Sequence, residues 1–349
     1  MAGFYNGTNI VTQRLGFACK FIPMLAEHDV KQLNATSTTV AWLNRQKQNI
    51  AEQKLWDIAH HNCDAYGRVF EIMATWPQHL KMLRLGSEML PMYTESTWRY
   101  FWQLPHVKTA VSDKLKKLGD LAREHDIRLS FHPGQFCCVA SDRPDVVERS
   151  IEEFEYHADV ARMMGYGSSW HDHGYKINIH ISGRLGPAGM LASIQRLSTE
   201  ARNLISIEND EMSWGLDDTL KLAQHTALVL DVHHHFVKTG AYISPTDDRV
   251  KIVEDSWRGV RPTLHYSLPI SGTPHVTARG TRNTTKLRAH SDMCWHPGVN
   301  DYVLKFWDRF DIMVEAKNKN LAQHQLYEQA LNTGHIKRPQ PHENNTTGG

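Results

Sequence analysis

The sequence predicts an α/β protein built as a single (β/α)8 barrel, a TIM barrel, with a helical segment inserted after the first strand. Three observations lead to this prediction: the length of 349 residues, eight short β-rich runs, and segments with helical spacing between these runs. A chain of this length is long for an ordinary domain but falls within the usual range of a barrel that carries insertions. Alternating strand and helix patterns are typical of βα units in a parallel sheet.

The eight runs predicted as strands are short, mostly apolar and spread over nearly the whole chain. They cover residues 15–19, 82–86, 128–132, 176–182, 204–208, 227–231, 262–267 and 311–315. Residues 1–335 are therefore assigned to one barrel domain. The tail at residues 336–349 has no apolar pattern, and we expect it to be disordered.

Two insertions and one clear helix complete the predicted layout. Residues 26–80 separate the first two strands, and we expect a pair of helices there. An aromatic loop at residues 93–107 follows the second strand. The clearest helix follows the third strand, where Pro144 and Gly165 provide start and stop signals. Between them, apolar side chains recur at helical steps: Val147, Ile151, Phe154, Ala158 and Ala161.

The composition argues against several classes of protein. Hydrophobic residues make up 41% of the chain and charged residues 22%, which allows a large core and argues against global disorder. No run of 18 or more apolar residues suggests a membrane span, and the first residues lack the pattern of a secretory signal. The five cysteines are scattered, which is typical of reduced thiols. We therefore expect a cytoplasmic or nucleoid-associated protein that is neither secreted nor bound to a membrane.

One segment concentrates positive charge, although the net charge of the chain is only +1. No acidic residue occurs between Asp255 and Asp292, where six cationic side chains lie: Arg258, Arg261, Arg279, Arg282, Lys286 and Arg288. A protein of this balance that binds nucleic acid must gather its cations locally, because affinity comes from phosphate neutralisation. Judged alone, the segment is equally well explained as a solvated basic loop.

Polar side chains interrupt the predicted strands at their carboxyl ends. Six strands end in an imidazole or a carboxylate: His132, His180, Glu208, Asp231, His265 and Glu315. Any one of them alone would more often be a structural histidine or a salt-bridge partner. In an α/β barrel, however, this end of the strands faces the active site, so all six would converge. Buried groups of this kind are costly unless they are paired or bind a metal, and the coincidence favours a metal centre.

The donor set also indicates the chemistry. Histidine with aspartate and glutamate, without cysteine, suits manganese, zinc, iron or magnesium, and a carboxylate can bridge two ions. Two such ions can activate a water and stabilise the leaving oxygen when a phosphodiester is hydrolysed. Metal-dependent sugar isomerisation, which other barrels perform, stays open at this point.

Eight short motifs follow one another in order between residues 14 and 317: RLGFAC, RLGSEMLP, LSFHPGQF, NIHISG, IENDE, LDVHH, LHYS and VEAKNK. This ordered set resembles the UV damage endonucleases and, more distantly, the endonuclease IV type of abasic-site enzyme. The resemblance implies a monomeric, metal-dependent DNA repair endonuclease that acts on damaged double-stranded DNA. It would hydrolyse the phosphodiester immediately 5′ to pyrimidine dimers, 6-4 photoproducts and often abasic sites, leaving a 3′-hydroxyl and a 5′-phosphate.

The resemblance also implies roles for individual residues. One ion would be held by three strand-end residues: His132, His180 and Glu208. A second ion would share Glu208 and take three further ligands: Asp231, His265 and Glu315. The implied catalytic residues belong to the same set: Glu208, Glu315, Asp231 and His265. His234, chosen over its neighbours by its spacing from Asp231, and His290 would match the ligands of a third ion. Two or three divalent ions are therefore expected, manganese first, with zinc, magnesium or iron as alternatives.

The expected DNA contacts come from two loops. Gln135 and Phe136 match the pair that family members insert into the duplex at the lesion, where an amide and a flat ring suit exposed bases. The basic segment leads to His290 and so belongs on the DNA-facing rim, with four candidates for phosphate contact: Arg279, Arg282, Lys286 and Arg288. The aromatic loop either lines the same groove or packs over the barrel mouth, through four side chains: Trp98, Tyr100, Phe101 and Trp102.

Some positions depart from the family pattern. Phe17 and Phe136 stand where tyrosine is common, Phe21 where asparagine is common, and Thr263 where a lysine is common. These departures leave the two-metal core intact but bear on the third ion and on the range of lesions. An abasic-site endonuclease with little photoproduct activity is therefore the second interpretation. A metal-dependent sugar isomerase, which would need a closed pocket, is the third.

Overall fold

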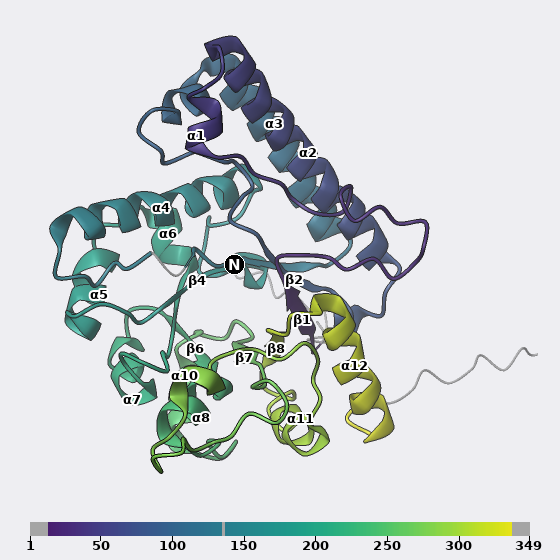
Figure 1. The fold of residues 1–349 in the computed structure, drawn as a ribbon, viewed down its shortest axis with the longest axis vertical. Helices are drawn as coiled ribbons and strands as arrows, with labels where there is room; N and C mark the ends of the chain where they lie inside the picture. The colour runs from purple at the N-terminus through teal and green to yellow at the C-terminus, as the bar shows by residue number, and fades with distance from the viewer. Residues whose placement is uncertain (1–12, 135–136, 337–349) are drawn as a thin grey trace, which may run out of the picture.

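Eight parallel strands close into a barrel in the computed structural model, which describes residues 13–134 and 137–336 (Figure 1). The strands pair in sequence order and β8 returns to β1: β1 (Leu15–Ala18), β2 (Met82–Leu85), β3 (Arg128–Phe131), β4 (Lys176–His180), β5 (Ile205–Glu208), β6 (Ala227–Asp231), β7 (Thr263–Tyr266) and β8 (Asp311–Val314). Every one of these strands lies inside the run predicted for it. The predicted (β/α)8 fold is confirmed.

Helices cover the outside of the barrel and connect successive strands (Figure 1). The α-helices are α1 (Val40–Leu43), α2 (Gln48–Ala74), α3 (Pro105–Glu124), α4 (Pro144–Met163), α5 (Gly186–Ile194), α6 (Thr199–Leu204), α7 (Leu216–Thr219), α8 (Val232–Thr239), α9 (Asp248–Asp255), α10 (Thr284–Leu287), α11 (Pro297–Leu304) and α12 (Lys319–Asn332). Short 3-10 helices add η1 (Gln78–Leu80), η2 (Arg99–Gln103), η3 (Asp172–Gly174) and η4 (Leu220–Leu222).

The insertion between β1 and β2 holds the expected pair of helices, but the two are unequal. α1 has 4 residues, whereas α2 runs for 27. The Thr39 side chain accepts a hydrogen bond from the Trp42 amide and so caps α1. α2 packs along α3, and the two extend together beyond the barrel (Figure 1). Because α2 returns the chain from the end of β1 to the start of β2, this projection rises on the side where the strands end.

The helix predicted after the third strand is α4, and its limits follow the expected signals. Pro144 is its first residue, and Gly165 follows its end with φ of 87°. A side chain with a Cβ is strained at positive φ, so glycine suits this stop. Phe154, Ala158 and Ala161 are buried along one face, as their spacing predicts.

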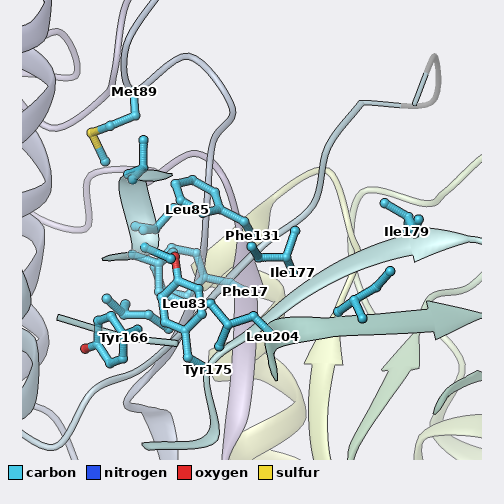
Figure 2. Packing of buried hydrophobic residues seen from close by; sticks show 14 of the residues in the cluster. Phe17, Leu83, Leu85, Met89, Phe131, Tyr166, Tyr175, Ile177, Ile179 and Leu204 are labelled. Carbon is cyan, nitrogen blue, oxygen red and sulfur yellow. The ribbon is translucent and has the colours of Figure 1, made fainter. Parts of the chain in front are cut away.

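The outer face of the strands is apolar and packs under the helices. Phe17, Leu83, Phe131 and Ile177 lie in this layer together with Tyr175, which precedes β4 (Figure 2). Successive side chains of a strand point to opposite faces. The residues between these apolar ones therefore point into the barrel.

The barrel interior is filled by side chains that meet across the axis. Ala18, Met82 and Met313 form a small apolar cluster. The Arg128 guanidinium pairs with Asp311 at 2.6 Å, and both side chains are almost completely buried. These two residues begin β3 and β8, so their ion pair lies at the amino end of the barrel. The polar strand-end residues occupy the opposite end.

The predicted domain limits are described only in part. The barrel takes up residues 13–134 and 137–336, while the tail expected to be disordered falls almost entirely on residues 337–349, outside the described residues. Among the helices that the structure describes, none is both long enough and apolar enough to span a membrane.

Candidate metal centre

Strand register brings the predicted ligands together at the carboxyl end of the barrel. His180 on β4 lies opposite Glu208 on β5, and Asp231 on β6 lies opposite His265 on β7. Alternation along each strand turns these side chains inward. Glu208, Asp231 and His265 are completely buried. Neighbouring strands thus present imidazoles and carboxylates to one another in the barrel interior.

Glu208 is the centre of the cluster. Its Oε2 atom lies 3.8 Å from His132 Nε2, 3.8 Å from His180 Nε2 and 3.0 Å from His265 Nδ1. Two groups of potential ligand atoms converge here, each within 4.8 Å: His132, His180 and Glu208, and Glu208, Asp231 and His265. Glu208 belongs to both groups, as a bridging carboxylate would.

Glu315, at the end of β8, joins the second group through His265. Its Oε1 atom lies 3.2 Å from His265 Nδ1 and also pairs with the Arg84 guanidinium. Burial acts to raise the pKa of Glu315, but the guanidinium of Arg84 holds this pKa well below its usual range. The carboxyl group is therefore ionised and available as a ligand.

Polar side chains from lower in the barrel hold the cluster in place. Asn178 Nδ2 donates a hydrogen bond to Glu208 Oε2, and Asn178 Oδ1 accepts one from the Ser206 hydroxyl at 2.9 Å. Lys176 Nζ lies 3.0 Å from His265 Nε2. Because Lys176 engages this ring nitrogen, His265 presents Nδ1 to the carboxylates. Such supporting contacts orient ligands in metal sites.

The cluster has the chemistry of a metal site. Glu208 Oε1 and Asp231 Oδ2 are buried and accept no hydrogen bond from the described residues. Burial raises the pKa of Asp231 well above its ordinary value, and the negative charges of Glu208 and Glu315 act in the same direction. Divalent cations would offset this crowding of carboxylates. The donors and their separations therefore fit such ions.

Of the three consecutive histidines in α8, His234 faces the cluster. Its amide N–H donates to Asp231 Oδ1 at 2.7 Å, and its ring Nδ1 lies 3.3 Å from Glu208 Oε1. His233 Nε2 instead lies 2.9 Å from the Leu287 carbonyl oxygen. The spacing that singles out His234 thus places its ring beside the predicted ligands.

The His290 ring lies beside the main chain of Glu315. Its ring centroid is 6.0 Å from that of His233, and a bridge to Pro269 fixes its main chain on the loop after β7. Within residues 13–134 and 137–336, His290 belongs to none of the groups of converging ligand atoms. Its role as a ligand stays a prediction.

The basic segment divides between the two ends of the barrel. Arg261 pairs with Asp311 at 2.7 Å, and the Arg258 guanidinium lies 3.7 Å from the centroid of the Trp170 ring. All four of these residues lie at or before the start of a strand, so this part of the segment belongs to the amino end. The predicted phosphate-contact residues lie beyond the carboxyl end of β7, on the side of the cluster.

These four candidates differ in what they contact. Arg282 donates to backbone carbonyls at the end of α8, at 2.5 and 2.7 Å. Arg288 forms an ion pair with Glu211. Arg279 and Lys286 are exposed to solvent.

A cavity of about 300 Å³ opens beside the cluster. Its lining includes His132, His180, Asp210, Glu211 and Arg288. Gly134 and Cys137 contribute to the same wall. Gln135 and Phe136, the pair predicted to enter the duplex, lie between them in sequence but outside the described residues.

Comparison with known proteins agrees with this architecture. The family model described as UV-endonuclease UvdE matches residues 13–344. The chain belongs to the UV-endonuclease UvdE family. The UV DNA damage endonuclease of Bacillus mycoides (strain KBAB4) is 27% identical over 316 residues, which cover 87% of this chain and 91% of the relative. The protein of the same name from Bacillus cereus (strain 03BB102) is 25% identical over 315 residues, covering 87% and 90%.

Two solved structures share the fold of this UvdE family member. SacUVDE superposes with a TM-score of 0.73 at 21% identity, covering 93% of this chain and 100% of that one. Endonuclease IV from Thermus thermophilus gives a TM-score of 0.50 at 13% identity, covering 77% and 94%. Both similarities are similarities of fold, and the fold they share is the barrel.

Two carboxylates that strand periodicity does not predict also lie at the cluster. Asp210 Oδ2 is 3.5 Å from His180 Nδ1, and Glu211 Oε2 is 3.7 Å from His234 Nε2. Both belong to the IENDE motif, and this motif is the sequence feature that could have identified them as candidate site residues. They follow the strand end at Glu208, where alternation no longer assigns a direction to side chains.

The aromatic loop packs against the projecting helices. Trp98, Phe101 and Trp102 are buried, whereas Tyr100 is 38% exposed. Trp98 Nε1 donates to Asn44 Oδ1 at 2.8 Å, which ties the loop to the end of α1. These contacts show a loop that packs against other parts of the protein. They do not favour the alternative in which the loop lines a groove.

Two of the departures from the family pattern lie away from the cluster. Phe17 and Phe21 pack with Trp76 in the layer outside the barrel. Thr263 is two residues before His265 on the inner face of β7, and its buried hydroxyl has no partner among the described residues. Of these three positions, Thr263 is therefore the one where the departure from the family pattern changes the barrel interior next to the proposed metal centre.

Proposed function

We propose that this protein is a DNA repair endonuclease that hydrolyses the phosphodiester immediately 5′ to UV photoproducts through a centre of divalent metal ions. The observation that carries the proposal is the convergence of strand-end imidazoles and carboxylates around Glu208 in a chain of the UvdE family. The name of the relatives, UV DNA damage endonuclease, supports the substrate class. The proposed lesions are pyrimidine dimers and 6-4 photoproducts, with abasic sites as further substrates in double-stranded DNA.

The proposed ligands form two groups around a shared carboxylate. The first group is His132, His180 and Glu208, and the second is Glu208, Asp231, His265 and Glu315. His234 and His290 are proposed for a third ion. When bound, such ions supply an activated water and stabilise the leaving oxygen of a phosphodiester. Manganese suits this mixed donor set, as zinc, iron or magnesium would.

The residues around the ligands prepare them before substrate arrives. The amide of Asn178 holds Glu208, and the amine of Lys176 holds His265 with Nδ1 toward the carboxylates. These contacts are buried, so water does not compete for them. Ligands fixed in this way need little reorganisation during the reaction.

Cationic side chains at the carboxyl end of the barrel are proposed to bind the DNA backbone. Arg288 lines the cavity beside the cluster, where a phosphate near the centre would meet it. Arg279 and Lys286 are exposed on the same loop and are suited to flanking phosphates. Gln135 and Phe136 are proposed to enter the duplex at the lesion.

The test is incision of end-labelled duplexes that carry one cyclobutane dimer, one 6-4 photoproduct, one abasic site or no lesion. Each is incubated with Mn²⁺ or with chelator, beside Glu208→Ala and the control Glu254→Ala, whose carboxylate on α9 pairs with Arg309 in the turn before β8. We expect metal-dependent cutting just 5′ of the photoproducts, lost in the Glu208 variant and kept in the control. Cutting at the abasic site alone would assign the protein to the abasic-site endonucleases, and no cutting of any duplex would contradict the proposal.

A further inference from the structure

Beyond the strand ends, His234 and Glu211 face each other at the mouth of the barrel. His234 lies in the first turn of α8, and Glu211 lies three residues after Glu208. His234 Nε2 and Glu211 Oε2 are 3.7 Å apart, which is too long for a hydrogen bond. With bonds of about 2.0 to 2.3 Å to one cation, neighbouring ligand atoms lie roughly 3 to 3.7 Å apart.

The orientation of the His234 ring follows from its other nitrogen. Nδ1 lies 3.0 Å from the carbonyl oxygen of Asn209. A carbonyl oxygen can only accept, so Nδ1 carries the hydrogen in this contact and donates it. The hydrogen bond to the main chain leaves Nε2 as the nitrogen that can bind a cation, and Nε2 is the atom that faces Glu211.

The carboxylate of Glu211 is held from the other side. One oxygen, Oε1, pairs with Arg288 Nε. The second oxygen, Oε2, is buried and accepts no hydrogen bond from the part of the chain that the structure describes. An unpaired buried carboxylate oxygen is costly. Here Glu211 Oε2 faces His234 Nε2, the ring nitrogen that carries no hydrogen when Nδ1 donates to the main chain.

His180, assigned above to the first ion, lies next to this pair. One ring nitrogen of His180, a carboxylate oxygen of Glu211 and a ring nitrogen of His234 all lie within 4.8 Å of one another. His180 and His234 come from β4 and from α8, and Glu211, in the loop after β5, is buried and held by its ion pair with Arg288. The imidazole of His234 and the carboxylate of Glu211 suit a divalent ion of the manganese or zinc type.

We propose that Glu211 is a metal ligand, which together with His234 holds a divalent cation at the barrel mouth, next to the ion that His180 would bind. Arg288 is the positioning residue that keeps Oε2 of Glu211 toward His234. The inference rests on the proposed function, because it completes the ligand set of a third ion at the same centre. It also links this ion to the DNA surface, since Arg288 lines the cavity.

The test counts metal ions in the absence of DNA. The full chain is stripped with chelator, titrated with Mn²⁺ or Zn²⁺ by calorimetry, and its bound metal is measured after gel filtration. We expect Glu211→Gln to bind one equivalent fewer than the unchanged protein. Asp292→Asn, which removes an exposed carboxylate paired with Lys317, should bind the full number. Arg288→Ala should keep the ion but weaken its binding by about 10- to 100-fold, as is usual when a supporting contact is lost.

An unchanged ion count and affinity in Glu211→Gln would overturn the proposal, even if His234→Gln lost an equivalent. Should the Glu211 variant fail to fold, anomalous diffraction from the unchanged protein soaked with Mn²⁺ decides the matter. A peak within bonding distance of Glu211 Oε2 and His234 Nε2 is expected, and the absence of a peak there would overturn the proposal. Because neither measurement uses DNA, a failed incision assay and a failed mouth site can be told apart.

Discussion

Replacing Lys176 by methionine should weaken metal binding while leaving the metal-free protein folded. Lys176 Nζ lies 3.0 Å from His265 Nε2, and both residues are completely buried inside the barrel. Methionine fills similar space but has no nitrogen to accept the Nε2–H of the ring, and this position of the hydrogen is the one that leaves Nδ1 free to bind a cation. His265 would then lose the contact that keeps its Nδ1 atom toward Glu208 and Glu315.

The size of the effect follows from the nature of this contact. Loss of a supporting hydrogen bond to a metal-binding histidine typically lowers metal affinity by about 10- to 100-fold. That range corresponds to about 1.4 to 2.7 kcal/mol of binding free energy. The metal-free protein should lose little stability, because burial already lowers the pKa of the Lys176 amine to about 7 and so opposes its charge.

The assay compares thermal unfolding with and without saturating Mn²⁺ and adds calorimetric titration of the metal. A metal ion that binds only the folded state raises the free energy of unfolding, and this gain grows with the logarithm of the metal affinity. We expect Lys176→Met to lose part of the metal-induced gain, while Lys114→Met, whose amine pairs with Asp64 between α2 and α3, keeps it. Unchanged affinity at every ion site in Lys176→Met would refute the reasoning.

Two further predictions concern the two ends of the barrel. Neutralising Arg279 and Lys286 together should weaken binding to damaged and undamaged duplexes alike, and should reduce the slope of log affinity against log salt by about 2. Arg258→Gln at the amino end should change neither the affinity nor the slope. Equal slopes for all three proteins would contradict the prediction. Asp311→Ala should cost about 3 to 5 kcal/mol of unfolding free energy in a urea titration, because it leaves Arg128 buried without its partner. A loss below about 1 kcal/mol would show that Arg128 finds another partner.

The barrel and the positions of its ligands could be predicted because both follow from periodicity. Each strand alternates an apolar outer residue with an inner one, and the inner one at the carboxyl end is polar. His180, Glu208 and Asp231 are therefore predictable from their strands alone. Lys176 and Asn178 precede His180 by four and two positions, so the same alternation identifies them as interior residues.

Residues outside the strands could not be placed in this way. Glu211 follows the strand end, and its direction depends on the ion pair with Arg288, which is 77 residues away in the chain. Arg261 has the same charge as Arg279 in the same basic segment, yet it pairs with Asp311 at the opposite end of the barrel. Charge runs along the chain do not reveal such partners, because the partners come from distant elements.

The aromatic loop shows the same limit. Its sequence allows both an exposed groove lining and a packed cover. The choice is made by Asn44 at the end of α1, which accepts the hydrogen bond of the Trp98 indole across 54 residues of chain. A tertiary contact of this kind has no signature in local spacing.

The most direct measurement is the position of metal ions in crystals of the protein grown with Mn²⁺, located by anomalous scattering. We predict two peaks that share Glu208 as a ligand, one beside His132 and His180 and the other beside Asp231 and His265. Peaks that avoid Glu208, or no peak inside the barrel mouth, would contradict a metal centre built from the strand ends.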